Sequence, residues 1–83
     1  MTDQSDAVEV YPGIAVDARV MHGVPVIAGT RIPAQLIVGQ LAAGDSIEAL
    51  MEAYALSREQ VQAALGYAAE RLGAESVYAL PTA

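Results

Sequence analysis

The sequence contains no cysteine, tryptophan, phenylalanine or lysine. Without cysteine the chain has no disulfide, no thiolate nucleophile and none of the common zinc clusters. Its single histidine, His22, excludes a site with several histidine ligands, and the acidic residues are spread along the chain. We therefore expect no metal and no cofactor.

No catalytic constellation is visible either. His22 stands beside Gly23, a neighbourhood typical of a turn rather than of a general base. Glu48 and Glu52 lie one helical turn apart, which is typical of a solvated helix face, because acid–base pairs need burial to tune them. We do not expect an enzyme.

Long apolar runs are also absent. Charges or glycines interrupt every apolar segment before it reaches the ~18 residues of a membrane helix. The first residues, 1–6, are polar and lack the basic stretch followed by an apolar run that marks a secretory signal. We therefore expect a cytoplasmic protein that does not enter the membrane.

Positive charge is scarce. Four arginines, Arg19, Arg31, Arg58 and Arg71, face ten acidic residues, for a net charge of -6. Because a duplex is held by many cationic contacts to phosphates, this balance opposes non-specific nucleic-acid binding. Apolar residues reach 54% while charged residues make up only 17%, below the usual quarter. A chain of 83 residues forms one small domain, so the apolar surplus predicts an oligomer.

The first part of the chain predicts short strands. Residues 1–10 are predicted to be a flexible arm, followed by a turn at Pro12-Gly13. Two β-branched pieces at 19–21 and 24–27 predict two short strands or a hairpin. Pro25 lies in the second piece and confines it to a sheet edge, because proline donates no hydrogen bond to a ladder.

The second part predicts three helices. The first begins at Pro33 and ends at Gly44. The second and third each begin with a capping box, formed by Asp45 with Glu48 and by Ser57 with Gln60. The second helix buries a stripe of Ile47, Leu50, Met51 and Tyr54, and the third, which ends at Gly73, buries Val61, Leu65, Ala68 and Leu72.

The last two helices are joined by about three residues, which predicts a helix-turn-helix. The predicted organisation is an arm over 1–10, one domain over 11–73 and a tail over 74–83. The fold class is mainly α, with a three-helix helix-turn-helix-like domain preceded by short N-terminal β-strands or a hairpin.

Two polar segments are candidates for binding. Thr30 offers a hydroxyl and Arg31 a rigid donor fork that suits phosphate; alternatively, Arg31 pairs with Asp17 or Asp45, and Thr30 helps to cap the helix beginning at Pro33. The third helix begins with Ser57, Arg58, Gln60 and Gln62, residue types that recognise bases from the start of a recognition helix. The alternative there is a solvated helix face with an ordinary cap.

The tail is apolar for a chain end. Val77, Tyr78 and Leu80 are candidates for docking, either on the domain's own core or on a partner.

Much of the chain, about residues 11–72, resembles the family called domain of unknown function 433. The segments that carry the resemblance are Ile14-Ala-Val-Asp17, Gly23-Val-Pro-Val-Ile-Ala-Gly-Thr-Arg-Ile-Pro33, Gly44-Asp-Ser-Ile-Glu48 and Leu56-Ser-Arg-Glu-Gln-Val-Gln-Ala-Ala-Leu-Gly-Tyr-Ala68. The resemblance implies a homeodomain-like helix-turn-helix domain that is often dimeric. It also implies a VapB-type antitoxin encoded beside a PIN-like ribonuclease toxin.

The sequence therefore leads to two hypotheses. In the first, the chain neutralises a PIN-like toxin and, as a homodimer or a toxin complex, binds operator DNA to regulate its own operon. DNA then meets Ser57, Arg58, Gln60, Gln62, Arg19, Thr30 and Arg31, while Val77, Tyr78 and Leu80 cover the toxin. In the second, the chain is a dimeric protein-interaction module with no nucleic-acid role.

Overall fold

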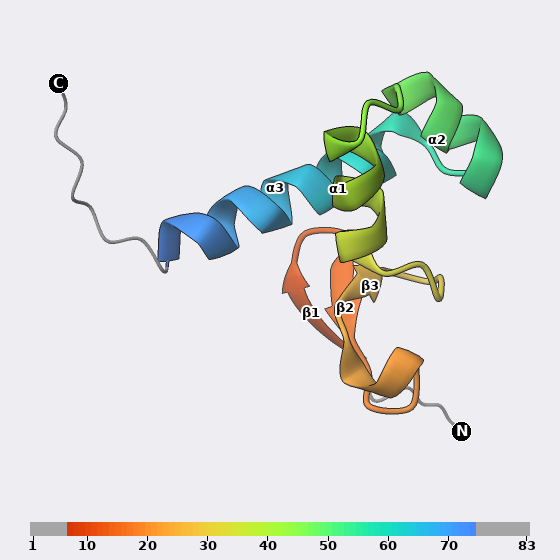
Figure 1. The fold of residues 1–83 in the computed structure, drawn as a ribbon. Coiled ribbons are helices and arrows are strands. Elements are labelled where there is room, and N and C mark those ends of the chain that lie inside the picture. The colour runs from red at the N-terminus through yellow and green to blue at the C-terminus, as the bar shows by residue number, and fades with distance from the viewer. Residues whose placement is uncertain (1–6, 75–83) are drawn as a thin grey trace, which may run out of the picture.

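A small antiparallel sheet lies under three helices in the computed structural model, which describes residues 7–74 (Figure 1). The elements are β1 (Val8–Tyr11), β2 (Ile14–Val16), β3 (Val26–Ile27), α1 (Ala34–Ala42), α2 (Ile47–Tyr54) and α3 (Arg58–Ala74). The predicted mainly helical, helix-turn-helix-like fold with strands before it is confirmed. Among the described residues, no helix is long and apolar enough to cross a membrane.

The sheet has the order β1-β2-β3 with antiparallel pairing throughout. β1 and β2 form a hairpin around Pro12-Gly13, as the turn signal predicts, and the Gly13 amide donates to the Glu9 carboxylate at 2.9 Å. Strand β1 therefore occupies the end of the segment predicted as a flexible arm, and that prediction is wrong for residues 8–10. Residues 1–6 lie outside the described part.

The predicted strand over residues 19–21 is wrong. Met21–Gly23 forms a short 3-10 turn instead, in which Met21 and His22 have left-handed φ angles of 51° and 59°. Asp17, nearly buried, organises the approach to this turn, because its Oδ1 accepts the Arg19 amide at 2.9 Å. The second predicted strand shortens to β3, which is a sheet edge, as Pro25 just before it requires.

A tight turn joins β3 to α1. The Thr30 hydroxyl donates to the Ile27 carbonyl at 2.7 Å and accepts the Ile32 amide at 2.9 Å. Pro33 precedes α1, and no side chain caps that helix. Thr30 therefore closes the turn, and the expectation that it caps the helix is wrong.

The two later helices are capped by serines. Ser46 Oγ accepts the Ala49 amide at 3.0 Å, so Ser46 caps α2. The prediction that Asp45 is the cap is wrong. At α3 the predicted capping box is confirmed in both directions: Ser57 Oγ accepts the Gln60 amide at 3.1 Å, and Gln60 Oε1 accepts the Ser57 amide at 2.8 Å. The prediction that α3 ends at Gly73 is wrong, because Ala74, the last residue that the structure describes, is still helical.

The core lies where the three helices meet the sheet. Its buried members come from both layers and are Ile14, Ile27, Ala34, Ile37, Leu50, Leu56, Val61 and Ala64. The predicted stripe of α2 is confirmed, with Leu50 buried and its neighbours half-buried. The stripe of α3 is wrong in part, because Leu65 and Leu72 are exposed and Ala64 faces the core in their place.

Candidate functional site

The α2–α3 unit has the geometry of a helix-turn-helix. Only three residues connect the helices, and Ala55 adopts a left-handed conformation with φ 57° and ψ 47°. The Leu56 amide then donates to the Met51 carbonyl at 2.9 Å, closing α2 with the hydrogen bond typical of a left-handed helix end. Because Leu56 is buried in the core, this turn fixes α3 against α2.

The polar side chains at the start of α3 bind within the protein. Ser57 and Gln60 cap the helix, as described above, and the Arg58 guanidinium donates to Glu48 Oε2 on α2 at 2.6 Å. The hydrogen bond from Arg58 is the main reason that the pKa of Glu48 lies below its ordinary value. Both partners are largely exposed, as is Gln62. Three of the four predicted DNA-contacting side chains of this helix thus already have partners.

The surface around this unit is acidic. Four exposed carboxylates lie on α2, at the start of α3 and just before α2, and the one on Glu48 pairs with Arg58; they belong to Asp45, Glu48, Glu52 and Glu59. Such a surface repels phosphate and attracts cationic groups.

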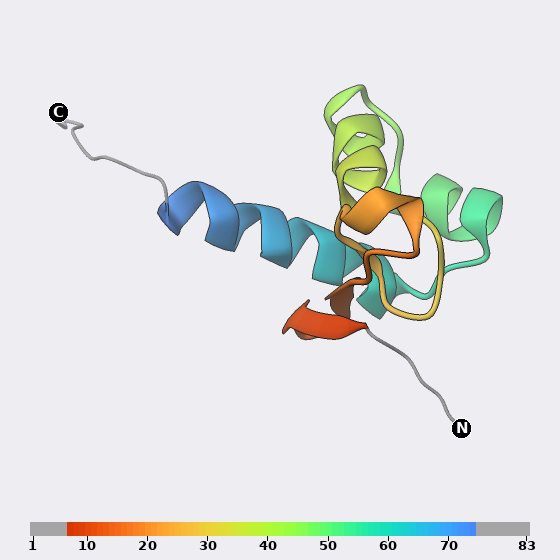
Figure 2. The same ribbon diagram turned by 90° about the horizontal axis from the view of Figure 1, so that it is seen from below.

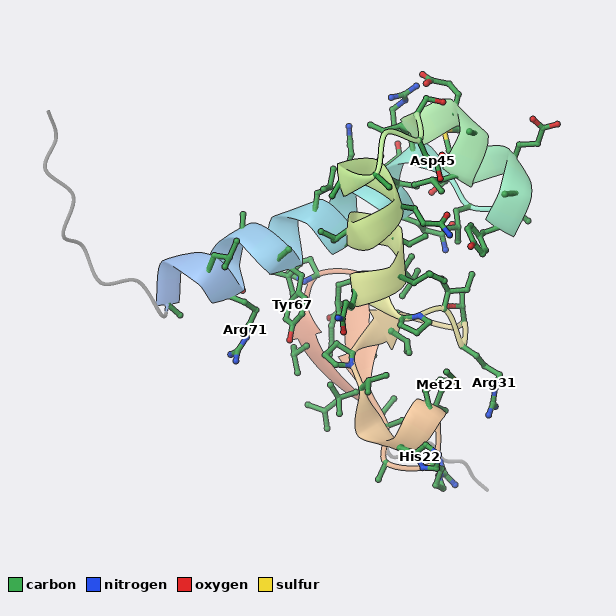
Figure 3. The ribbon with its side chains drawn as sticks, viewed as in Figure 1. Met21, His22, Arg31, Asp45, Tyr67 and Arg71 are labelled. Carbon is green, nitrogen blue, oxygen red and sulfur yellow. The ribbon has the colours of Figure 1, made fainter. Side chains whose placement is uncertain are left out.

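The other arginines predicted to meet phosphates lie elsewhere. Figure 3 places Arg31 near Met21 and His22, at the end of the molecule opposite Asp45. Within residues 7–74 Arg31 forms no ion pair with Asp17 or Asp45, so that alternative is wrong. Asp17 lies instead against Arg19, with Arg19 Nε 3.4 Å from Oδ1. The structure therefore does not bring Arg19 and Arg31 together with Arg58 in one patch.

The pKa of Asp17 is held below its ordinary value. The largest cause is the hydrogen bond that the Arg19 amide donates to the carboxylate, and the Arg19 guanidinium adds to it. The charge on Asp17 therefore supports the turn that follows it, which forms one wall of the cavity described next.

A large apolar groove lies between α1, α3 and the turn after β2. Its volume is about 550 Å³. The lining side chains are apolar except for Gln35 and Arg71, and comprise Met21, Val24, Pro25, Pro33, Ala34, Gln35, Val38, Ala64, Tyr67, Ala68, Arg71 and Leu72. In Figure 3, Tyr67 and Arg71 extend from α3 toward the side on which Met21 lies. We call this feature the apolar groove.

Sequence reasoning did not find this groove as a site. The signal for it was the apolar surplus, together with Met21 and Val24, which were assigned to strands, and Leu72, which was assigned to the core. The predicted partner-binding residues Val77, Tyr78 and Leu80 lie outside the described residues. Within 7–74 no three His, Cys, Asp or Glu side chains cluster in a way that holds a metal ion.

Comparison with known proteins gives one family and one related fold. Residues 14–68 match the family described as "Protein of unknown function (DUF433)". No curated protein sequence matches the chain. A similar solved structure is the X-ray crystal structure of Rv2018 from Mycobacterium tuberculosis, with a TM-score of 0.57 and 29% sequence identity. The match covers 63% of this chain but only 24% of Rv2018.

Proposed function

This chain belongs to the DUF433 family, and from that premise we propose that it is an antitoxin-like protein of the cytoplasm. It binds and neutralises a PIN-like ribonuclease toxin, and it represses its own operon by binding operator DNA together with that toxin. The resemblance stated from the sequence motivates the role.

The observation that carries the proposal is the α2–α3 unit, a helix-turn-helix whose one cation at the start of α3, Arg58, is already bound to Glu48. The unit has the shape that enters a major groove, yet its surroundings are acidic. A partner that supplies positive charge resolves this conflict. A ribonuclease, whose substrate is a polyanion, is a partner of that kind, and its attraction to an acidic antitoxin speeds their encounter.

The test is co-expression of the chain with the product of the adjacent gene. We expect a stable complex, inhibition of ribonuclease activity, and a shift of the operon's own promoter DNA that is much stronger with the complex than with this chain alone. DNA binding should weaken steeply as salt is added, because it releases counterions. Absence of both the complex and the promoter shift rejects the proposal.

A matched pair of variants tests the role of the Arg58 ion pair. Glu48→Gln removes the carboxylate that holds Arg58 and lowers the negative charge beside α3, so the complex should bind promoter DNA several-fold more tightly. Glu70→Gln makes the same change of charge on the far half of α3 and should leave the affinity nearly unchanged. Equal effects of the two variants would show that only net charge matters, and they would contradict contact between the DNA and the N-terminal end of α3.

A second candidate is a dimeric protein-interaction module with no nucleic-acid role. Its specific support is that Ser57, Arg58 and Gln60 satisfy one another and their neighbours within the chain. In this case the chain binds a protein partner with an affinity that varies little with salt, and no promoter fragment is shifted in any mixture.

A further inference from the structure

We propose that the apolar groove is a binding site for a small amphipathic monocarboxylate, a molecule with an apolar body and one carboxylate group. The apolar body lies against Met21, Val24 and Leu72, and the carboxylate lies at Arg71. Such a site is independent of the antitoxin role, because it lies within one chain and needs neither toxin nor DNA.

The groove has the size and the composition of a small-molecule site. Its volume of about 550 Å³ falls within the range of roughly 300–1,000 Å³ that is usual for ligand pockets. Such pockets are mostly apolar and carry a few polar groups that fix the orientation of the ligand. In this groove the polar side-chain groups come from Gln35, Tyr67 and Arg71, and the other lining side chains are apolar.

Several apolar side chains of the groove remain in water in the isolated chain. Leu72 is 69% exposed, Val24 41% and Met21 39%. They come from α3 and from the segment between β2 and β3, and they border one cavity. Figure 2 shows the far half of α3 projecting away from the other elements, so the groove is open along this half. The apolar body of a ligand that enters there removes this surface from water, and that burial is the main source of its affinity.

The charge of the groove selects an anion. Among the described residues that line it, Arg71 is the one charged side chain, and none is acidic. A guanidinium matches a carboxylate in shape, because two parallel N–H groups donate to its two oxygens. It has five such donors, so Arg71 can hold a carboxylate in addition to the contact that it makes within the chain.

Further hydrogen-bond donors accompany Arg71. Tyr67 and Arg71 lie one helical turn apart on α3, so their side chains share one face of the helix. In Figure 3 both extend toward the side on which Met21 lies. The Tyr67 hydroxyl and the Gln35 amide are the other donors among the lining side chains. The polar part of the groove thus suits an acceptor group, as a carboxylate is.

The charge of the whole chain limits the ligand to one negative charge. A net charge of -6 repels a polyanion over the whole molecule. The acidic surface around α2, with Asp45, lies away from Tyr67 and Arg71 (Figure 3), and physiological salt screens charges beyond about 8 Å. A monocarboxylate beside Arg71 is therefore attracted locally and meets little repulsion from the distant carboxylates.

The first experiment titrates the full chain with decanoate, an apolar chain that ends in one carboxylate, and follows the backbone amides by NMR. We expect saturable binding with a dissociation constant on the order of 0.1–1 mM, because a ligand of this size gains modest energy per atom. The shifts should gather at Met21, Val24, Ala68 and Leu72. Decyltrimethylammonium has an apolar chain of the same length and the opposite charge, and should bind at least about tenfold more weakly.

Variants separate the charge of the groove from its shape. Arg71→Gln should raise the dissociation constant of decanoate about tenfold and should not weaken decyltrimethylammonium. Ala68→Phe places a ring in the groove and should abolish decanoate binding. Leu65→Phe is the matched control, since Leu65 is exposed on the same helix but does not line the groove, and it should leave binding intact.

Circular dichroism and the thermal midpoint of each variant show whether it is folded, and if Ala68→Phe unfolds the domain, the Arg71→Gln comparison decides alone. Absence of saturable binding up to about 10 mM decanoate overturns the proposal. Equal affinity for the two ligands, or a decanoate affinity that Arg71→Gln leaves unchanged, overturns it as well, because the groove then adsorbs apolar chains without regard to charge. Shifts that gather on α2 place the ligand outside the groove and have the same consequence.

Discussion

Two surfaces of this molecule handle unsatisfied groups in opposite ways. Around the α2–α3 turn, the polar side chains bind one another locally: Ser57 pairs with Gln60, and Arg58 with Glu48. In the apolar groove, Leu72 and Met21 remain in water. The difference teaches that a polar side chain is satisfied by one or two partners, whereas apolar side chains need a whole packed layer to cover them. A small domain buries a smaller fraction of its surface than a large one, so its core does not cover all of its apolar side chains.

The largest expected effect comes from the core that supports both surfaces. Ile37 on α1 is fully buried in that core. Ile37→Ala should lower the free energy of unfolding by about 2–5 kcal/mol. Leu36→Ala, at an exposed position next to it, should cost much less. Urea denaturation followed by circular dichroism and by tyrosine fluorescence checks this; non-coincident transitions mean that the two surfaces unfold separately.

A smaller effect is expected at Gly66, where α3 meets Tyr11 of β1. A Cβ at Gly66 would overlap the ring of Tyr11, which contacts Tyr67 edge-on with centroids 6.2 Å apart. Alanine ordinarily stabilises a helix interior, but Gly66→Ala should destabilise by about 1–3 kcal/mol because the ring must move.

Gly39 in α1 is the control, since nothing lies within 4 Å of a Cβ there. Gly39→Ala should stabilise by up to about 1 kcal/mol. Thermal denaturation of both variants gives the comparison, and equal shifts contradict the Tyr11 contact.

The turn unit has its own test at Ala55. Its left-handed backbone strains any residue with a Cβ, and glycine removes that strain at the cost of a more flexible unfolded chain. Ala55→Gly should therefore stabilise by about 0.5–1 kcal/mol. Ala55→Val, with a branched Cβ, should destabilise. The unfolding free energy in urea measures both, and a stabilising valine contradicts the turn geometry.

The smallest effect concerns pH and the wall of the groove. The pKa of Asp17 is lower in the folded chain than in the unfolded one. Its stabilising contribution is therefore complete above the unfolded value, about 4, and is lost as pH falls through the lowered folded value. As the pH is lowered below about 4, the thermal midpoint of unfolding should decrease, and it should decrease less steeply in Asp17→Asn. Glu48 acts with the same sign, so the variant should retain part of the dependence.

The helical part of the fold follows from short-range signals. The serine cap of α3 and the stripe of α2 each depend on neighbours within one or two turns, and these predictions are confirmed. The errors arise where one local hydrogen bond decides between alternatives that the sequence pattern leaves open. Asp45 and Ser46 are both good caps, and only the path of the chain selects Ser46. Residues 19–21 favour a strand, yet the carboxylate of Asp17 bends the chain into a left-handed turn.

The candidate site was harder to predict because it joins residues that lie far apart in the sequence. Arg31 and Arg58 are both close to helix starts in the sequence, but Arg58 pairs with Glu48 on α2, whereas Arg31 lies far from Asp45, which precedes α2 (Figure 3). Leu72 has the spacing of a core residue, because periodicity identifies an apolar face and does not reveal whether the core extends far enough to cover it. The apolar groove exists because the core does not extend along the whole of α3, and only the three-dimensional structure shows this.

Val61 and Ala64 of α3 are buried, whereas residues 69–74 are all exposed, and this difference divides one continuous helix into two classes of amide hydrogen exchange. The amides around Val61 and Ala64 should exchange only when the whole domain unfolds, whereas those near Leu72 should open by local fraying. A partner that covers the apolar groove would protect the latter amides, and the protection would grow with the concentration of that partner. The exchange rate of a few amides in the last turns of α3 would thus report whether the groove is covered, with the first turns as an internal standard for global stability.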